Sequence, residues 1–519
     1  MKGPDVLDPM KQLEDALVLC KFGRFHLRLL LVCLVSNMAT TVATTTASYV
    51  VTNAECQLGI GNVEKGLFIS TSFFGQLLTT PLAGIASDAF GRRPFLIFGN
   101  LFMAIFCLLQ GLSQSFWMLM LMKLGEGMAS GFSINLVGTM LAECTNKNVR
   151  DRIMVAYVTF FPMGQIIVVL FAWAILPREL DVVLWKGYFE IHSWQLFLFT
   201  CTIWGLLASI QFYCLPESPK YTLAQDKPEE ALEIIKKIFS ENTGSDKDTF
   251  PIKSLTGMRE TDTVVKASVR KQLTMVVFNI KYLFRKPLVG ILCLVCLMNT
   301  MVTAFFSTIR MWNPQMLTII ENYESTHVET TRFCVMIDEY YVQKNSQVMT
   351  SNITNIVEEA CVSVISGSST YKNILLISAI TTLSIGSCVF LVKYFTQKQL
   401  ISVSLTLCVF CSVALHFIRY SVMIAATLGF TTSLSIAAFS FLNNITIRVF
   451  PTSIRSSAVA VNFTFCRLSS VVGNIVFPLL IQYRCIVPFT TLTVGIGVAA
   501  FLSFFLPDPS KDNKDTGDR

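Results

Sequence analysis

The chain has 519 residues, of which 53% are hydrophobic and only 14% are charged, and its mean hydropathy is +0.57. Soluble domains carry about 25% charged residues, whereas apolar runs of roughly 18 residues or more, long enough to cross a bilayer, recur along this chain. These features exclude a soluble protein with an apolar core. The net charge of +7 is modest and lies in short segments between the runs, a distribution that sets membrane topology and does not indicate a nucleic-acid partner.

Apolar runs predict an all-α membrane protein with twelve transmembrane helices in two six-helix lobes. The N-terminal residues 1–26 are polar and lack the layout of a cleaved signal peptide, so we expect them to be cytoplasmic. The predicted spans are 27–51, 65–87, 94–114, 116–142, 153–176 and 194–214 in the first lobe (27–214), and 287–311, 372–393, 398–418, 421–447, 457–482 and 486–506 in the second (287–506). A polar linker, 215–286, separates the lobes, and residues 507–519 form a cytoplasmic tail.

Loop charges predict the orientation of these spans. Basic residues gather in alternate loops: Lys21, Arg24, Arg28, Arg92, Arg93, Lys147, Arg150, Arg152, Lys220, Lys227, Lys236, Lys237, Arg448 and Arg455. The loop 52–64, by contrast, contains Glu55 and Glu64 and no basic residue. Short loops rich in Lys and Arg stay inside, so both termini are expected in the cytoplasm of a multi-pass protein of the plasma membrane or an intracellular vesicle membrane.

The linker contains a predicted amphipathic helix at 227–239. Pro228 suits a first helical turn, and Leu232, Ile235 and Phe239 share one face. We expect this face to lie against the cytoplasmic ends of the bundle.

The longest non-cytoplasmic loop is predicted at about 313–371. It contains a glycosylation sequon at Asn352 and two cysteines, Cys334 and Cys361, for which we expect a disulfide in an oxidising compartment. Cys56, in the first outer loop, has no evident partner.

A short turn between the second and third spans, Gly84 to Arg93, combines glycines with charged residues. Asp88 lies close enough to pair with an arginine or with the end of a neighbouring helix. In the six-plus-six arrangement, this G-x-x-x-D-x-x-G-R-R motif resembles the major facilitator superfamily. The resemblance implies a cytoplasmic gate whose ion pairs break when the lobes rock; its members here are Gly84, Asp88, Gly91, Arg92, Arg93, Glu143, Arg150, Arg152, Glu217 and Arg455. Glu143 is expected to pair with Arg150 and Arg152.

The chain more specifically resembles the synaptic vesicle glycoprotein 2 family and, more loosely, organic cation transporters. The matching segments are 13–17, 22–26, 172–177, 192–194, 215–220, 450–455, 467–470 and 473–478. The resemblance implies a transmembrane transporter that moves a small organic solute by alternating access.

Several residues depart from the family pattern. The first span, from Asn37 to Thr46, has no acidic residue, the second copy of the gate motif has decayed near 393–398, and Asn443 replaces an expected Asp. The outer loop is also shorter than in the vertebrate vesicle glycoproteins. These losses leave open an alternative: a transporter-like membrane protein that acts in vesicle trafficking or ligand binding without transport.

Candidate substrate-binding residues follow from the resemblance and from charge in the membrane, and each has a structural alternative. The candidates are Trp173, Phe439, Asn443, Asn37, Glu126 and Arg467. Trp173 is alternatively an interfacial anchor, Asn443 an interhelical hydrogen-bond partner and Asn37 a helix-packing residue. Glu126 is either a proton site or the partner of Lys123, three residues away. Arg467 binds either an anionic group or backbone carbonyls.

The sequence shows no nucleophile–base arrangement, phosphate loop or metal-ligand spacing; Cys293 and Cys296 lack a second pair. We therefore expect no enzymatic activity, no cofactor and no metal. The expected partners are the lipid bilayer and a small organic solute, whether sugar, organic cation or organic anion, with a coupling ion left open.

Overall fold

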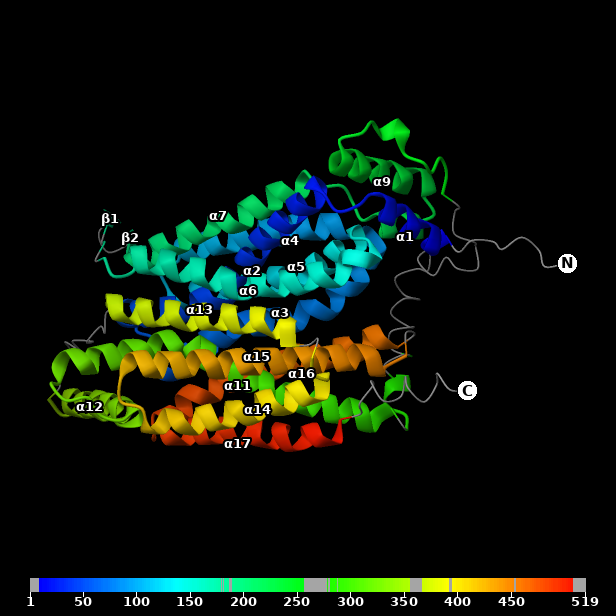
Figure 1. Cartoon of the computed structure of the whole chain (residues 1–519). Coiled ribbons are helices and arrows are strands. Elements are labelled where there is room, and N and C mark those ends of the chain that lie inside the picture. The colour runs from blue at the N-terminus through cyan, green and yellow to red at the C-terminus, as the bar shows by residue number, and fades with distance from the viewer. Residues whose placement is uncertain are drawn as a thin grey trace.

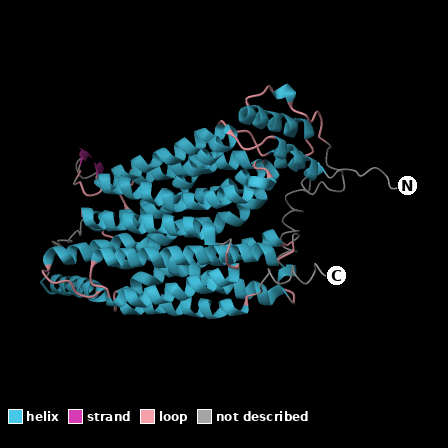
Figure 2. Ribbon diagram, viewed as in Figure 1, coloured by secondary structure: helices cyan, strands magenta, loops and turns pink. Residues whose placement is uncertain are grey.

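A computed structural model of the protein describes residues 9–178, 180, 182–185, 189–255, 278, 281–286, 288–354, 366–391, 394–451 and 454–506. Almost all regular structure in these residues is helical, with one short two-stranded ribbon at one end of the molecule (Figure 2). The ribbon pairs β1 (Val182–Trp185) with β2 (Phe189–Ile191) in antiparallel fashion.

Two groups of long helices lie side by side and form the two lobes (Figure 1). The N-terminal lobe contains α2 (Arg24–Leu58), α3 (Asn62–Phe90), α4 (Arg92–Gly111), α5 (Phe116–Cys144), α6 (Lys147–Ile175) and α7 (Ser193–Tyr213). The C-terminal lobe contains α11 (Leu288–Thr326), α13 (Ser368–Leu391), α14 (Gln397–Ala414), α15 (Ser421–Val449), α16 (Arg455–Ile481) and α17 (Ile486–Leu502).

Each of the twelve predicted spans falls on one of these helices. Nine of the described helices are long and apolar enough to cross a membrane; α3, α5 and α13 are not among them. In α5, Lys123, Glu126 and several glycines and serines lower the mean hydropathy. The fold class is therefore confirmed, whereas membrane crossing by these three helices stays a prediction.

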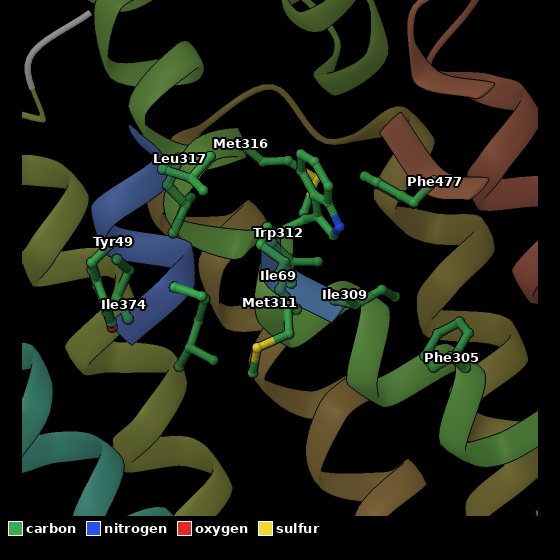
Figure 3. Packing of buried hydrophobic residues seen from close by; sticks show 14 of the residues in the cluster. Tyr49, Ile69, Phe305, Ile309, Met311, Trp312, Met316, Leu317, Ile374 and Phe477 are labelled. Carbon is green, nitrogen blue, oxygen red and sulfur yellow. The ribbon is translucent and has the colours of Figure 1, made fainter. Parts of the chain in front are cut away.

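The lobes meet mainly along two helix pairs, α3 against α16 and α6 against α13, and α2 also contacts α11. Large side chains fill the core beside this seam (Figure 3), where Trp312 of α11 packs against Phe477 of α16 with ring centroids 5.4 Å apart. Gly66 of α3 is buried here, and a Cβ on it would lie 2.8 Å from the Asn474 carbonyl oxygen and from Pro478. Two helix backbones can approach this closely only because glycine has no side chain.

The two ends of the bundle differ (Figure 1). One end, called here the α9 end, has α1 (Pro9–Leu19), α8 (Pro219–Ala224) and α9 (Pro228–Thr243). The predicted amphipathic helix is thus confirmed as α9, which buries Leu232 and Ile235 in one cluster with Leu13 and Leu17 of α1. Gly244, at φ +73°, ends it in the left-handed conformation that glycine adopts readily.

The other end, called the α12 end, differs from the prediction of a long loop. Helix α11 continues to Thr326, and a further helix, α12 (Phe333–Thr354), follows six residues later. The sequon residue Asn352 lies in the last turn of α12.

The predicted Cys334–Cys361 disulfide is wrong, because Cys334 is bonded to Cys485. The Phe333 amide donates to the Ile418 carbonyl, and the Asp338 carboxylate accepts from the Cys485 amide at 2.5 Å. These bonds and the disulfide place the start of α12 beside Ile418, which precedes α15, and beside Cys485, which precedes α17. Cys56 is also disulfide-bonded, and Cys361 lies outside the described residues.

Candidate functional site

A cavity of about 300 Å³ lies between the two lobes. Helices α2, α3, α5 and α6 line it from one side and α11, α13, α15 and α16 from the other. Its walls include the aromatic residues Tyr157, Phe161, Phe306, Phe439 and Phe463. A cavity shared by two lobes is where a transporter of this architecture binds its solute.

Three predicted binding residues, Asn37, Phe439 and Arg467, line this cavity. The Phe439 ring lies 5.6 Å from that of Phe306 and 6.1 Å from that of Phe463, measured between centroids. Together, these residues place a polar, an aromatic and a cationic group on the wall of the same cavity.

The sequence prediction missed Arg310, which also lines the cavity. Its guanidinium lies over the ring of Phe161, 4.4 Å from the centroid, and its Nε has no hydrogen-bond acceptor. Arg310 lies one residue before the end of the predicted span 287–311. An arginine inside an apolar run is a signal that could have found it, because a charge at membrane depth indicates a functional residue.

Asn443 lies outside the cavity lining. The Asn462 side chain donates to Asn443 Oδ1 at 2.8 Å, and Asn299 donates to Asn462 Oδ1 at 3.1 Å. This asparagine chain connects α15, α16 and α11, which agrees with the interhelical alternative.

Trp173 lies near the α12 end of α6. Its indole Nε1 donates to Ser368 Oγ of α13 at 3.3 Å. The side chain therefore bridges the lobes and does not line the central cavity.

Glu126 forms a buried ion pair. Lys123 Nζ lies 2.8 Å from Glu126 Oε2, and their side chains are 0% and 1% exposed. Gln110 donates to the same oxygen at 2.8 Å, and Lys123 also donates to Thr46 Oγ1 at 2.6 Å. This network joins α2, α4 and α5. It agrees with the alternative in which Glu126 is the structural partner of Lys123.

The predicted gate centres on Arg92, where α4 begins. Its guanidinium lies 2.7 Å from the Asp88 carboxylate and 3.2 Å from that of Glu143. Glu217, from the segment after α7, accepts from the backbone amides of Arg92 and Arg93 at 3.1–3.2 Å. A carboxylate at a helix N-terminus satisfies free amides and the helix dipole.

Gly91 makes the close approach of Glu217 feasible. Its φ is +102°, and a Cβ there would lie 2.5 Å from Glu217 Oε2. A Cβ added at Gly84, in contrast, would have no atom within 4 Å, so no close contact requires a glycine there.

Other gate charges differ from the prediction. Arg150 pairs with Glu14 of α1 at 2.8 Å, whereas Glu143 pairs with Arg92; the expected Glu143–Arg150 pair is wrong because α1 docks beside Arg150. Arg152 is exposed, and Arg455 donates to the Phe450 carbonyl at 3.4 Å. Among the described residues, each hydrogen bond and ion pair of these side chains stays within one half of the chain.

Docking of α1 depends on a carboxylate that is sensitive to acid. Burial by itself raises the pKa of Glu14, but hydrogen bonds and charge from Lys220 and Arg150 outweigh it and hold that pKa below its ordinary value of 4.5. Because docking lowers the pKa of Glu14, the ionised carboxylate stabilises the docked α1 fully at pH values above 4.5. This stabilisation is lost as the pH falls through the lowered pKa of Glu14.

We expect a spin label at exposed Lys11→Cys to become more mobile as the pH falls below about 4.5. Glu14→Gln should give the mobile spectrum already at neutral pH. Glu229→Gln, an exposed change on α9, is the control and should retain the transition. An acid transition unaltered by Glu14→Gln would contradict this role.

At the α12 end, one ion pair connects the two halves of the chain. Glu55 of α2 lies 2.5 Å from Lys65 of α3 and also pairs with Lys344 of α12. The Lys65 side chain is fully buried and that of Glu55 is 18% exposed. We call Glu55, Lys65 and Lys344 the Glu55 cluster; with Trp173–Ser368 and the Gly66 contact, it closes the α12 end of the interface between the lobes.

A sequence profile described as Sugar (and other) transporter matches residues 30–320. This is more than half of the chain, which therefore belongs to this family of membrane transporters, within the major facilitator superfamily and with likeness to synaptic vesicle glycoprotein 2. The resemblances to the major facilitator superfamily and to synaptic vesicle glycoprotein 2 are thus confirmed.

Synaptic vesicle glycoprotein 2A of Pongo abelii is 25% identical over 232 residues, covering 45% of this chain and 31% of the relative. Glycoprotein 2C of Rattus norvegicus is 25% identical over 259 residues, covering 49% and 36%. The alignments span about a third of the length of these relatives.

Among solved structures, the xylose transporter XylE from E. coli is similar in fold. Its partially occluded inward open form superimposes with a TM-score of 0.60 at 12% identity, covering 93% of this chain and 100% of that one. Its inward open form gives 0.59 at 15% identity, covering 93% and 97%. At these identities the likeness concerns the fold alone.

Proposed function

We propose that this protein moves a small organic solute across a membrane by alternating access between its two lobes. The observation that carries the proposal is the central cavity, which eight helices from both lobes line. A solute bound there contacts both lobes, so rocking of one lobe against the other changes the side from which it is reached.

The proposed orientation places the α9 end in the cytoplasm. Arg92, Arg93, Arg150 and Lys220 lie at this end, and short basic loops stay inside. In this orientation the interlobe contacts of the Glu55 cluster close the outer side, while the gate residues bond within their own lobes. This pattern supports a cavity that opens toward the cytoplasm.

Uptake by the full chain in liposomes tests the proposal. The assay uses labelled D-xylose, D-glucose, choline and benzoate; at least one should accumulate above protein-free vesicles. Arg92→Gln should slow uptake by about tenfold, because loss of the guanidinium leaves the half-buried Glu143 unpaired.

Lys147→Gln is the matched control, since its pair with Asp15 is exposed on both sides and surface pairs contribute little. Absence of uptake for every solute by folded, inserted protein would reject transport and favour the binding or trafficking alternative. Equal loss in both variants would reject the assigned gate.

A further inference from the structure

We propose that the solute bound in the central cavity carries an anionic group, held between Arg310 and Arg467, on a small aromatic or apolar body. This inference rests on the proposed function and names the chemical class of the solute. It is carried by the charges, free donors and rings that line one cavity.

The cavity has two cationic side chains and, among its described lining residues, no Asp or Glu. Arginine stays protonated in proteins, and a charge at membrane depth is costly unless paired. No described carboxylate forms an ion pair with Arg310 or Arg467. The cavity is therefore electropositive and suited to a negative ligand.

Four basic residues of α3, α4, α5 and α6 make an informative contrast. Each of four has a carboxylate within 3.2 Å: Lys65 with Glu55, Lys123 with Glu126, Arg92 with Glu143 and Arg150 with Glu14. These four cations each have a counter-charge, whereas Arg310 and Arg467 have none among the described residues.

Further polar side chains line the same cavity as Arg310. Arg310 Nε and Ser307 Oγ are buried atoms without a hydrogen-bond partner. The Thr303 hydroxyl and the Asn37 amide face Cys466 and Tyr157 but have no partner at hydrogen-bond geometry, and all four residues line the cavity. Residues 303, 307 and 310 share one face of α11 because they lie at helical spacing. An acceptor-only group such as a carboxylate, sulfonate or phosphate matches this excess of donors.

The rest of the lining describes the body of the solute. Phe439 packs against Phe306 and Phe463 on the C-terminal side. Phe161, from the N-terminal lobe, makes a cation–π contact with the Arg310 guanidinium. An organic cation would meet two positive charges here. A body with an apolar or aromatic face fits these rings.

A binding measurement on the purified full chain tests the inference without requiring transport. The probes are benzoate, benzenesulfonate and phenyl phosphate, with benzamide and benzyltrimethylammonium as uncharged and cationic counterparts at equal ionic strength. At least one anion should raise the thermal unfolding midpoint in a saturable manner, and the two counterparts should not. No shift with any anion, or an equal shift with benzamide, overturns the proposal.

Variants locate the site. Arg310→Gln and Arg467→Gln should each weaken anion binding by at least about tenfold, whereas Arg332→Gln, an exposed arginine over Phe417 at the α12 end, should leave it unchanged. Arg310→Lys and Ser307→Ala provide milder changes if a glutamine variant fails to fold, and both should weaken binding. Unchanged affinity in all four cavity variants overturns the site.

The outcomes separate this inference from the proposed function. Anion binding that depends on both arginines, without uptake of any solute, would retain the inference and reject transport. Uptake of an uncharged or cationic solute that is unaffected by Arg310→Gln and Arg467→Gln would retain transport and reject the inference.

Discussion

Glu126→Ala is expected to destabilise the protein by about 3–5 kcal/mol, because it leaves the ammonium of Lys123 buried without a counter-charge. The Lys123 side chain is fully buried, and its remaining described partner is the Thr46 hydroxyl. The measurement is the thermal unfolding midpoint of detergent-purified protein, together with the yield of folded protein.

The double variant Lys123→Met/Glu126→Met is the matched control for this prediction. Removing both charges avoids an unpaired ion, and replacement of a buried pair by apolar residues is often nearly neutral. The double variant should therefore recover most of the loss seen in Glu126→Ala. If Glu126→Ala were instead as stable as the wild type and uptake lost its pH dependence, Glu126 would be a proton site.

The twelve-helix pattern could be predicted because a bilayer imposes a minimum length on every apolar segment. The turn from Gly84 to Arg93 was recognisable because its glycines and charged residues lie close together in the sequence. The structure adds the contacts between residues that are far apart in the sequence. Glu217 reaches the Arg92 and Arg93 amides from another element, which no spacing around the motif shows.

Pairing over long distances could not be predicted. Cys334 and Cys485 are 151 residues apart, and the sequence offered a nearer cysteine, Cys361. The same limit applies to the cavity: a family pattern does not show which way a side chain points, so Asn443 was expected in the pocket although it bonds to Asn462. Arg310 lies next to the predicted end of its span at residue 311, whereas in the structure α11 continues to Thr326 and Arg310 lines the cavity.

Glu55→Ala is expected to open the α12 end of the interface between the lobes. In the closed arrangement the change leaves Lys65 fully buried without its carboxylate and frees Lys344 from its pair across the lobes. An unpaired buried charge costs about 3–5 kcal/mol, and parting of the lobes would expose Lys65 to water. The ratio of closed to open protein should then fall by about 10²-fold or more, since 1.36 kcal/mol corresponds to tenfold.

A distance between the lobes reports this shift directly. Spin labels at Val63→Cys and Val328→Cys occupy exposed positions at this end of the two lobes, with the exposed Cys214 and Cys293 replaced by serine. The distance distribution should lengthen in Glu55→Ala, and to a lesser degree in Lys344→Met, in which Glu55 keeps Lys65. Glu329→Gln, an exposed change between α11 and α12, should leave it unaltered. Helix α12 carries Lys344, so a lengthening seen only in the variants of the Glu55 cluster would make this helix part of the outer gate. Identical distance distributions in all variants would reject a gating role for α12.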